Sequence, residues 1–131
     1  MNWSNPRIEA PMPEEAVTEI RPHEHVLLIA VLKRSLDETS AHQLTDEVLT
    51  AAAARPHVPI VLDMSHVRFA PSTALGSLVK LNRGFRLDGR KLALIGIDPR
   101  VLGAIKVTCL DAVLEIHNTL EQVIGTTTKK K

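Results

Sequence analysis

The sequence predicts an α/β fold, a single domain with a mostly parallel sheet of four to five strands flanked by helices. Short apolar runs of strand length alternate along the chain with longer segments whose apolar residues recur at helical spacing. Strands that alternate with helices pair in parallel, because each helix returns the chain to the same end of the sheet. A length of 131 residues suits one domain, and a hydrophobic content of 44% can build its core.

Five segments have the length and composition of strands. The run 25–31 is apolar without interruption by turn residues, which is typical of a strand covered on both faces of the sheet. The run 17–20 is expected to form a short edge strand. The expected strands span residues 17–20, 25–31, 58–62, 92–97 and 113–116.

The first helix is expected to follow the second strand. Asp37, Thr39 or Ser40 can cap it, because the side-chain oxygen of each can accept a hydrogen bond from an unpaired backbone N–H group. An apolar stripe continues to about Ala54, where an Arg-Pro pair ends the helix.

Three further helices complete the pattern. The second is expected from residue 73 to about residue 87, where an Asp-Gly pair ends it. Pro99 suits the first turn of the third helix, because a missing N–H group costs nothing there. Thr119 is expected to cap the last helix.

The two ends of the chain are expected to lie outside the domain. Residues 1–16 hold three prolines and few apolar side chains, so they are expected to form an extended arm. Residues 126–131 are polar and basic, and are expected to form a solvated tail. The domain itself is expected to span residues 17–125.

Composition excludes several classes of function. The formal net charge is only +1, so no basic field points to nucleic acid. One Trp, two Phe and no Tyr leave no platform for stacking bases. The N-terminus lacks a basic and apolar signal pattern, and no apolar run approaches the ~20 residues that span a bilayer. We therefore expect a cytoplasmic domain that does not insert into membranes.

The sequence offers no clear catalytic or metal site. His23 and His25 form the only close histidine pair, and no carboxylate or thiol lies at a useful spacing from them. Cys109 is the only cysteine, so it cannot form an internal disulfide, and its apolar surroundings predict a small packed side chain. We expect no metal, no cofactor and no enzymatic activity. A small α/β enzyme is the weakest hypothesis, because no nucleophile, base and orienting group converge.

The segment that joins the third strand to the second helix is the most informative part of the chain. Ser72 and Thr73 are adjacent hydroxyl residues at the expected helix start, where unpaired N–H groups and the positive end of the helix dipole lie. A hydroxyl there either caps the helix or carries a phosphate group that the helix end accommodates. Asp63 ends the preceding strand, where it can form a turn or face a ligand crevice.

Four segments, in this order, resemble the STAS family of anti-sigma-factor antagonists and their relatives. Asp63-Met64-Ser65 matches the Asp-Leu-Ser that ends an apolar strand in the family. Residues 69–76 match Phe-x-Asp-Ser-Ser/Thr-Gly-Leu-Gly, with Pro71 in place of Asp and Ala74 in place of Gly. Residues 89–101 resemble the family's glycine, apolar strand and Gly-x-x-Pro-x-Val, and residues 108–116 resemble its Thr-Gly-Leu-Asp ending. The likeness runs from about residue 26 to residue 123.

This resemblance implies a regulatory module that binds a kinase-type anti-sigma factor. By position, Thr73 matches the residue that is phosphorylated in the family, with Ser72 as the alternative. Phosphorylation would release the partner without unfolding the domain. We expect a monomer or a weak dimer. The residues expected to form the partner surface are Asp37, Asp63, Ser72, Thr73, Leu75 and Gly76.

A second hypothesis keeps the fold and removes the switch. Pro71 replaces the acidic residue that stands beside the phosphate acceptor in the family, and its ring stiffens the chain at that point. The chain would then be a STAS scaffold that is not phosphorylated, or a subunit associated with a transporter.

Overall fold

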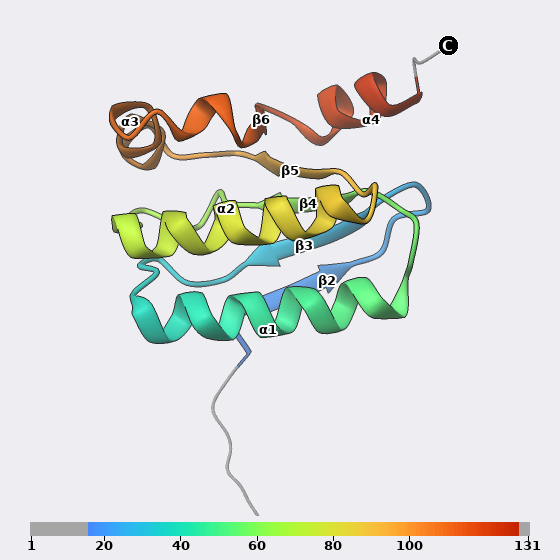
Figure 1. The fold of residues 1–131 in the computed structure, drawn as a ribbon, viewed down its shortest axis with the longest axis horizontal. Helices are drawn as coiled ribbons and strands as arrows, with labels where there is room; N and C mark the ends of the chain where they lie inside the picture. The colour runs from blue at the N-terminus through green and yellow to red at the C-terminus, as the bar shows by residue number, and fades with distance from the viewer. Residues whose placement is uncertain (1–15, 129–131) are drawn as a thin grey trace, which may run out of the picture.

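The computed structural model describes residues 16–128, which form one five-stranded sheet with helices on both faces (Figure 1). The strand order is β2-β3-β4-β5-β6. β2 pairs antiparallel with β3, and the other three pairings are parallel, so the predicted α/β fold with a mostly parallel sheet is confirmed. The strands are β2 (Thr18–Arg21), β3 (Leu27–Val31), β4 (Ile60–Asp63), β5 (Leu92–Ile95) and β6 (Glu115–His117).

The helices follow the strands as the alternation predicts. α1 and α2 lie side by side across one face of the sheet (Figure 1). α4 continues to Thr128, three residues into the segment expected to be a tail, and most of the expected arm lies outside the described residues. The helices are α1 (Glu38–Ala54), α2 (Ser72–Leu87), α3 (Pro99–Val107), the short 3-10 helix η1 (Leu110–Ala112) and α4 (Leu120–Thr128).

The sheet buries apolar side chains on both faces, as the uninterrupted apolar strands predict. Side chains alternate between the faces along each strand. One set packs in the main core with the apolar faces of α1, α2 and α3, and the other packs with Val123 of α4. The first set includes Ile29, Leu62 and Leu94, and the second includes Val61 and Ala93. The main core fixes the position of α2, whose start carries the candidate site.

One prediction about the interior is wrong. Cys109 is exposed, whereas the apolar pattern around it predicts a packed side chain. The reason is the turn between α3 and η1, where Cys109 takes a left-handed backbone conformation with φ of 62°. That conformation favours glycine, and glycine is the residue that the family pattern has at this position.

Candidate functional site

The candidate site is built around the start of α2, at the end of the sheet where the parallel strands finish. α2 begins at Ser72, and Pro71 occupies the cap position with φ of −69° and ψ of 168°. The backbone N–H of Leu75 donates to the carbonyl of Pro71 at 3.1 Å, but no side chain caps the helix. The interpretation of Ser72 as the cap is therefore wrong. Proline takes the cap position, because its fixed φ already suits the turn into the helix.

Ser72 and Thr73 present their side chains to solvent, while the next two residues turn inward. Both hydroxyl residues are exposed, whereas Ala74 and Leu75 are each 1% exposed. Leu75 therefore anchors the helix start in the main core, and Gly76, the next residue, is half-buried. The pair is thus accessible from solvent without any rearrangement of the core.

Two neighbouring loops frame the helix start and are joined by backbone hydrogen bonds. The N–H groups of Arg68 and Phe69 donate to the carbonyl of Arg34 at 2.7 and 3.1 Å, and the N–H of Leu36 donates to the carbonyl of Phe69 at 3.0 Å. Phe69 is nevertheless 59% exposed. The loop beside Ser72 therefore carries an exposed aromatic side chain on a backbone that is held in place by hydrogen bonds.

Asp37 has a structural role at the start of α1. Its Oδ1 accepts hydrogen bonds from the backbone N–H of Ser40 at 2.8 Å and from the hydroxyl of Ser40 at 2.6 Å. These bonds favour the ionised carboxylate and hold the pKa of Asp37 below its ordinary value. Of the three capping candidates, Asp37 is therefore the cap, and it lies directly after the loop that is joined to Phe69.

Asp63 forms the turn that follows β4. Its Oδ1 accepts a hydrogen bond from the backbone N–H of Ser65 at 3.0 Å, and its Oδ2 lies 3.9 Å from Arg21 of β2. The neighbouring Gly96 has φ of 67°, and a Cβ atom there would lie 3.3 Å from Asp63 Oδ1. Asp63 therefore packs beside the β5–α3 turn and makes the local hydrogen bond typical of an aspartate in a turn.

Sequence reasoning missed an ion-pair cluster at the start of α3. Asp98 caps this helix by accepting from the backbone N–H of Arg100 at 2.8 Å. Its Oδ2 also lies 3.3 Å from Arg68 Nη1, which donates to the carbonyl of Ser65 at 2.9 Å as well. The bond from Arg100 and the two nearby guanidinium groups hold the pKa of Asp98 below its ordinary value. The Asp-Pro pair that opens α3 was the available signal for this cap.

Metal and membrane sites are not found in the described part of the chain. Across residues 16–128, no three His, Cys, Asp or Glu side chains come close enough to hold a metal ion together. His23 and His25 make an edge-on ring contact, with ring centroids 5.7 Å apart. In the same residues, no helix has the length and apolar character needed to cross a bilayer.

With the fold and the site described, comparison with known proteins assigns the chain to a family. The STAS domain family model matches residues 17–123, so this chain belongs to the STAS domain family. The predicted resemblance is thereby confirmed.

Solved structures show the same fold. An anti-sigma-factor antagonist (STAS) domain protein from Planctomyces limnophilus matches with a TM-score of 0.71 and 21% identity, over 84% of this chain and 96% of that chain. The anti-sigma factor antagonist SpoIIAA in its unphosphorylated form matches with a TM-score of 0.68 and 16% identity, over 87% and 98%.

A third structure is the murine anion transporter Solute Carrier 26 family member A9, with a TM-score of 0.72 and 15% identity. The match covers 84% of this chain and 19% of the transporter. At these identities the likeness is one of fold, and it includes both anti-sigma-factor antagonists and a part of a transporter.

Proposed function

We propose that this protein is a non-enzymatic regulatory module of the anti-sigma-factor antagonist type. It binds a kinase-type anti-sigma factor in the cytoplasm through the surface at the start of α2, and phosphorylation of Thr73 releases that partner. The observation that carries the proposal is the exposed Ser72-Thr73 pair on a helix start that no side chain caps.

The helix start explains why a phosphate group would act on binding and leave the fold intact. A phosphate on Thr73 adds about −1.5 to −2 charges beside the unpaired N–H groups and the positive end of the helix dipole. The helix therefore tolerates the charge. A partner seated on the same surface would have to bury it, which is unfavourable without a matching cation. Ser72 is the alternative acceptor, because it is exposed on the same turn.

The other expected partner residues take different parts in this proposal. Asp37 is exposed and follows the loop that is bonded to Phe69, and Gly76 is half-buried on the turn of α2 that follows the hydroxyl pair. Phe69 would add an apolar contact from the adjoining loop. Leu75 and Asp63 act by holding the helix start and the β4 turn in place, since Leu75 is buried and Asp63 is bonded to Ser65.

The test is phosphorylation of the full chain by each kinase-type anti-sigma factor of the source organism. We expect mass spectrometry to find phosphate on Thr73, and we expect Thr73→Ala to bind the partner both with and without ATP. Thr73→Glu should bind at least about tenfold more weakly, because one charge must be buried at the interface. Thr50→Glu is the matched control, since Thr50 is an exposed threonine on α1 away from this surface.

A second candidate function is favoured by Pro71. A STAS scaffold that is not phosphorylated, or a subunit associated with a transporter, needs no acidic residue beside a phosphate acceptor. Unmodified Thr73, together with equal partner binding by the wild type and Thr73→Glu, would support this second function and contradict the first.

A further inference from the structure

A cavity of about 520 Å³ opens at the opposite end of the molecule from Ser72 and Thr73. It lies between the last turns of α2, the η1 segment and the starts of β5 and β6, and its lining includes Asn82, Arg86 and Glu115. Cavities of this size with a few fixed polar groups are typical small-molecule sites. Its polar lining therefore indicates the kind of molecule that fits.

Asn82 is the buried polar residue of this lining. The residue is 4% exposed, and its Nδ2 donates to the carbonyl of Val113 at 3.1 Å. That bond fixes the orientation of the side-chain amide, whose second polar atom is the acceptor Oδ1. Among residues 16–128, no N–H or O–H group donates to this Oδ1. A buried amide oxygen without a donor is unfavourable, so a molecule in the cavity that supplies an O–H or N–H group would be stabilised there.

Arg86 brings positive charge to the same cavity. It follows Asn82 by four residues, so the two side chains lie on the same side of α2, with Cβ atoms about 6 Å apart. Within the described part of the chain, its guanidinium group makes no hydrogen bond and no ion pair. A guanidinium group presents a planar set of N–H donors that can bind two oxygens of a carboxylate or phosphate group at once.

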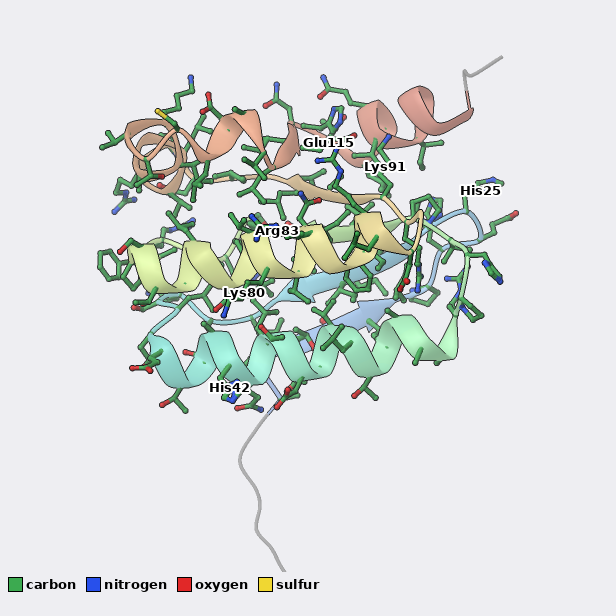
Figure 2. All side chains as sticks on the ribbon, in the orientation of Figure 1. His25, His42, Lys80, Arg83, Lys91 and Glu115 are labelled. Atoms are coloured by element: carbon green, nitrogen blue, oxygen red, sulfur yellow. The ribbon has the colours of Figure 1, made fainter. Side chains whose placement is uncertain are left out.

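The other charged groups of the lining, Arg90, Lys91 and Glu115, are already engaged. The guanidinium group of Arg90 donates to backbone carbonyls of Ala52, Arg55 and Val58. Lys91 Nζ lies 3.1 Å from Glu115 Oε2, and the same oxygen lies 2.7 Å from His117 Nε2. Figure 2 shows Lys91 and Glu115 next to each other near the starts of β5 and β6. Since Lys91 and Glu115 pair with each other and Arg90 is bonded to neutral carbonyls, the lining carries an excess of positive charge, and Arg86 is the cation left for a ligand.

We propose that this cavity binds a small anion that also carries a hydroxyl group. The acidic group of the ligand pairs with Arg86, and a hydroxyl one or two carbons away donates to Asn82 Oδ1. Phosphorylated and carboxylated polyols share this chemistry. The inference is independent of the proposed switch, because the cavity and the hydroxyl pair lie at opposite ends of α2.

The test is a titration of the isotopically labelled full chain by NMR, with glycerol 3-phosphate and glycerate as the two hydroxylated anions. Inorganic phosphate lacks the carbon-bound hydroxyl, and glycerol lacks the charge. We expect one of the two probes to give saturable shifts of the amides around the cavity, with a Kd of about 1 mM or below. Inorganic phosphate should bind more weakly than that probe, and glycerol should not bind.

Two arginine variants separate this site from general attraction of anions. Arg86→Gln should weaken binding of that probe at least about tenfold, because it removes a charged bidentate contact. Arg83→Gln removes the same charge from the same helix outside the cavity lining, and it should leave the affinity unchanged (Figure 2). Both residues are exposed, so both variants should keep the wild-type Tm.

Three outcomes would overturn the proposal. Absence of saturable shifts with both probes would mean that water alone satisfies Asn82. Equal losses in Arg83→Gln and Arg86→Gln would mean that the anion is attracted to the helix surface in general. Inorganic phosphate binding as tightly as the better probe would remove the role given to Asn82.

Discussion

At the end of the sheet where the parallel strands begin, two arginines hold the chain together. Arg90 donates hydrogen bonds of 2.8 to 3.1 Å to the carbonyls of Ala52, Arg55 and Val58, which belong to the end of α1 and the segment before β4. Arg55 donates in turn to the carbonyls of His23 and Val26 at 2.9 and 3.0 Å, in the β2–β3 connection. At the other end of the sheet, α2 begins with no side-chain cap and with Ser72 and Thr73 exposed.

The difference separates the source of stability from the surface proposed for binding. Carbonyls at the end of a helix have no partners within the helix, and the guanidinium group of Arg90 supplies them at several points at once. The start of α2 lacks such support and depends on its buried inner face instead, including Leu75 and Leu78. A charge added or removed at Thr73 should therefore change the free energy of unfolding little. Substitutions of the arginines at the other end should lower it strongly.

The largest expected effect is at the arginine end. Arg90→Ala should lower the free energy of unfolding by about 2–4 kcal/mol, because hydrogen bonds to charged groups contribute most and the carbonyls would lose their donors. Arg90→Lys should recover only part of the loss, since an ammonium group cannot reproduce the planar fork. Urea unfolding measures both variants.

The control for this prediction is Arg83→Ala, an exposed arginine of α2 outside this network. It should change stability by less than about 0.5 kcal/mol. If Arg90→Ala were as stable as Arg83→Ala, the view that this end of the sheet holds the fold would be wrong.

The second prediction concerns the capped helices at the other end. Hydrogen bonds hold the pKa values of Asp37 and Asp98 below their ordinary value of 3.8. A carboxyl whose pKa is lower in the folded state stabilises the fold above its unfolded pKa, and this contribution disappears as pH falls through the folded pKa. Stability from both caps should therefore be present at pH 7 and be lost below about pH 4.

The double variant Asp37→Asn and Asp98→Asn tests this sign. It should have a lower Tm than the wild type at neutral pH, and the two Tm values should converge as the pH falls below 4. Thermal unfolding across this pH range provides the measurement. Parallel curves for the two proteins would show that the caps do not titrate as their hydrogen bonds imply.

The third prediction sharpens the contrast between the capped helices and α2. Pro71→Asp should raise the free energy of unfolding by about 1 kcal/mol, because an aspartate at the cap position can accept from the unpaired N–H groups of the first turn. Pro71→Ala supplies no acceptor and should not stabilise the protein. If both variants change stability equally, then backbone stiffness and not capping decides this position.

Local patterns were sufficient to predict the strands and helices, because each one buries a continuous apolar face. The residues at which the strands and helices begin and end were less predictable. The second strand was expected from residue 25 but starts at Leu27, since the carbonyls just before it are held by Arg55, 29 to 32 residues further along the chain. The contacts of Arg90 were not predictable for the same reason, as its partners are backbone carbonyls 32 to 38 residues away.

Predictions about the site succeeded where a side chain acts through its own neighbours. The turn role of Asp63 and the cap formed by Asp37 both rest on bonds within three residues, which sequence spacing can indicate. For Ser72, sequence left capping and phosphorylation open, because a hydroxyl and a proline compete for the cap position and spacing alone does not rank them. Cys109 was misassigned because an apolar neighbourhood does not reveal a left-handed turn.

The smallest expected effect is at Ser72 itself. If this hydroxyl capped α2, Ser72→Ala would cost about 0.5–2 kcal/mol. The structure instead places Ser72 in the first helical turn, exposed and without a capping bond, so alanine removes no contact on which the fold depends. Alanine also has a slightly higher helix propensity than serine. We therefore expect Ser72→Ala to change the free energy of unfolding by no more than about 0.5 kcal/mol, in either direction, in urea unfolding.

A loss above 1 kcal/mol would show that the hydroxyl does bind the helix start in solution, and the two ends of the sheet would then differ less than their hydrogen bonds imply. A near-zero change would show that the fold does not need the Ser72 hydroxyl, which is the condition for a helix start whose surface can be modified without unfolding the domain.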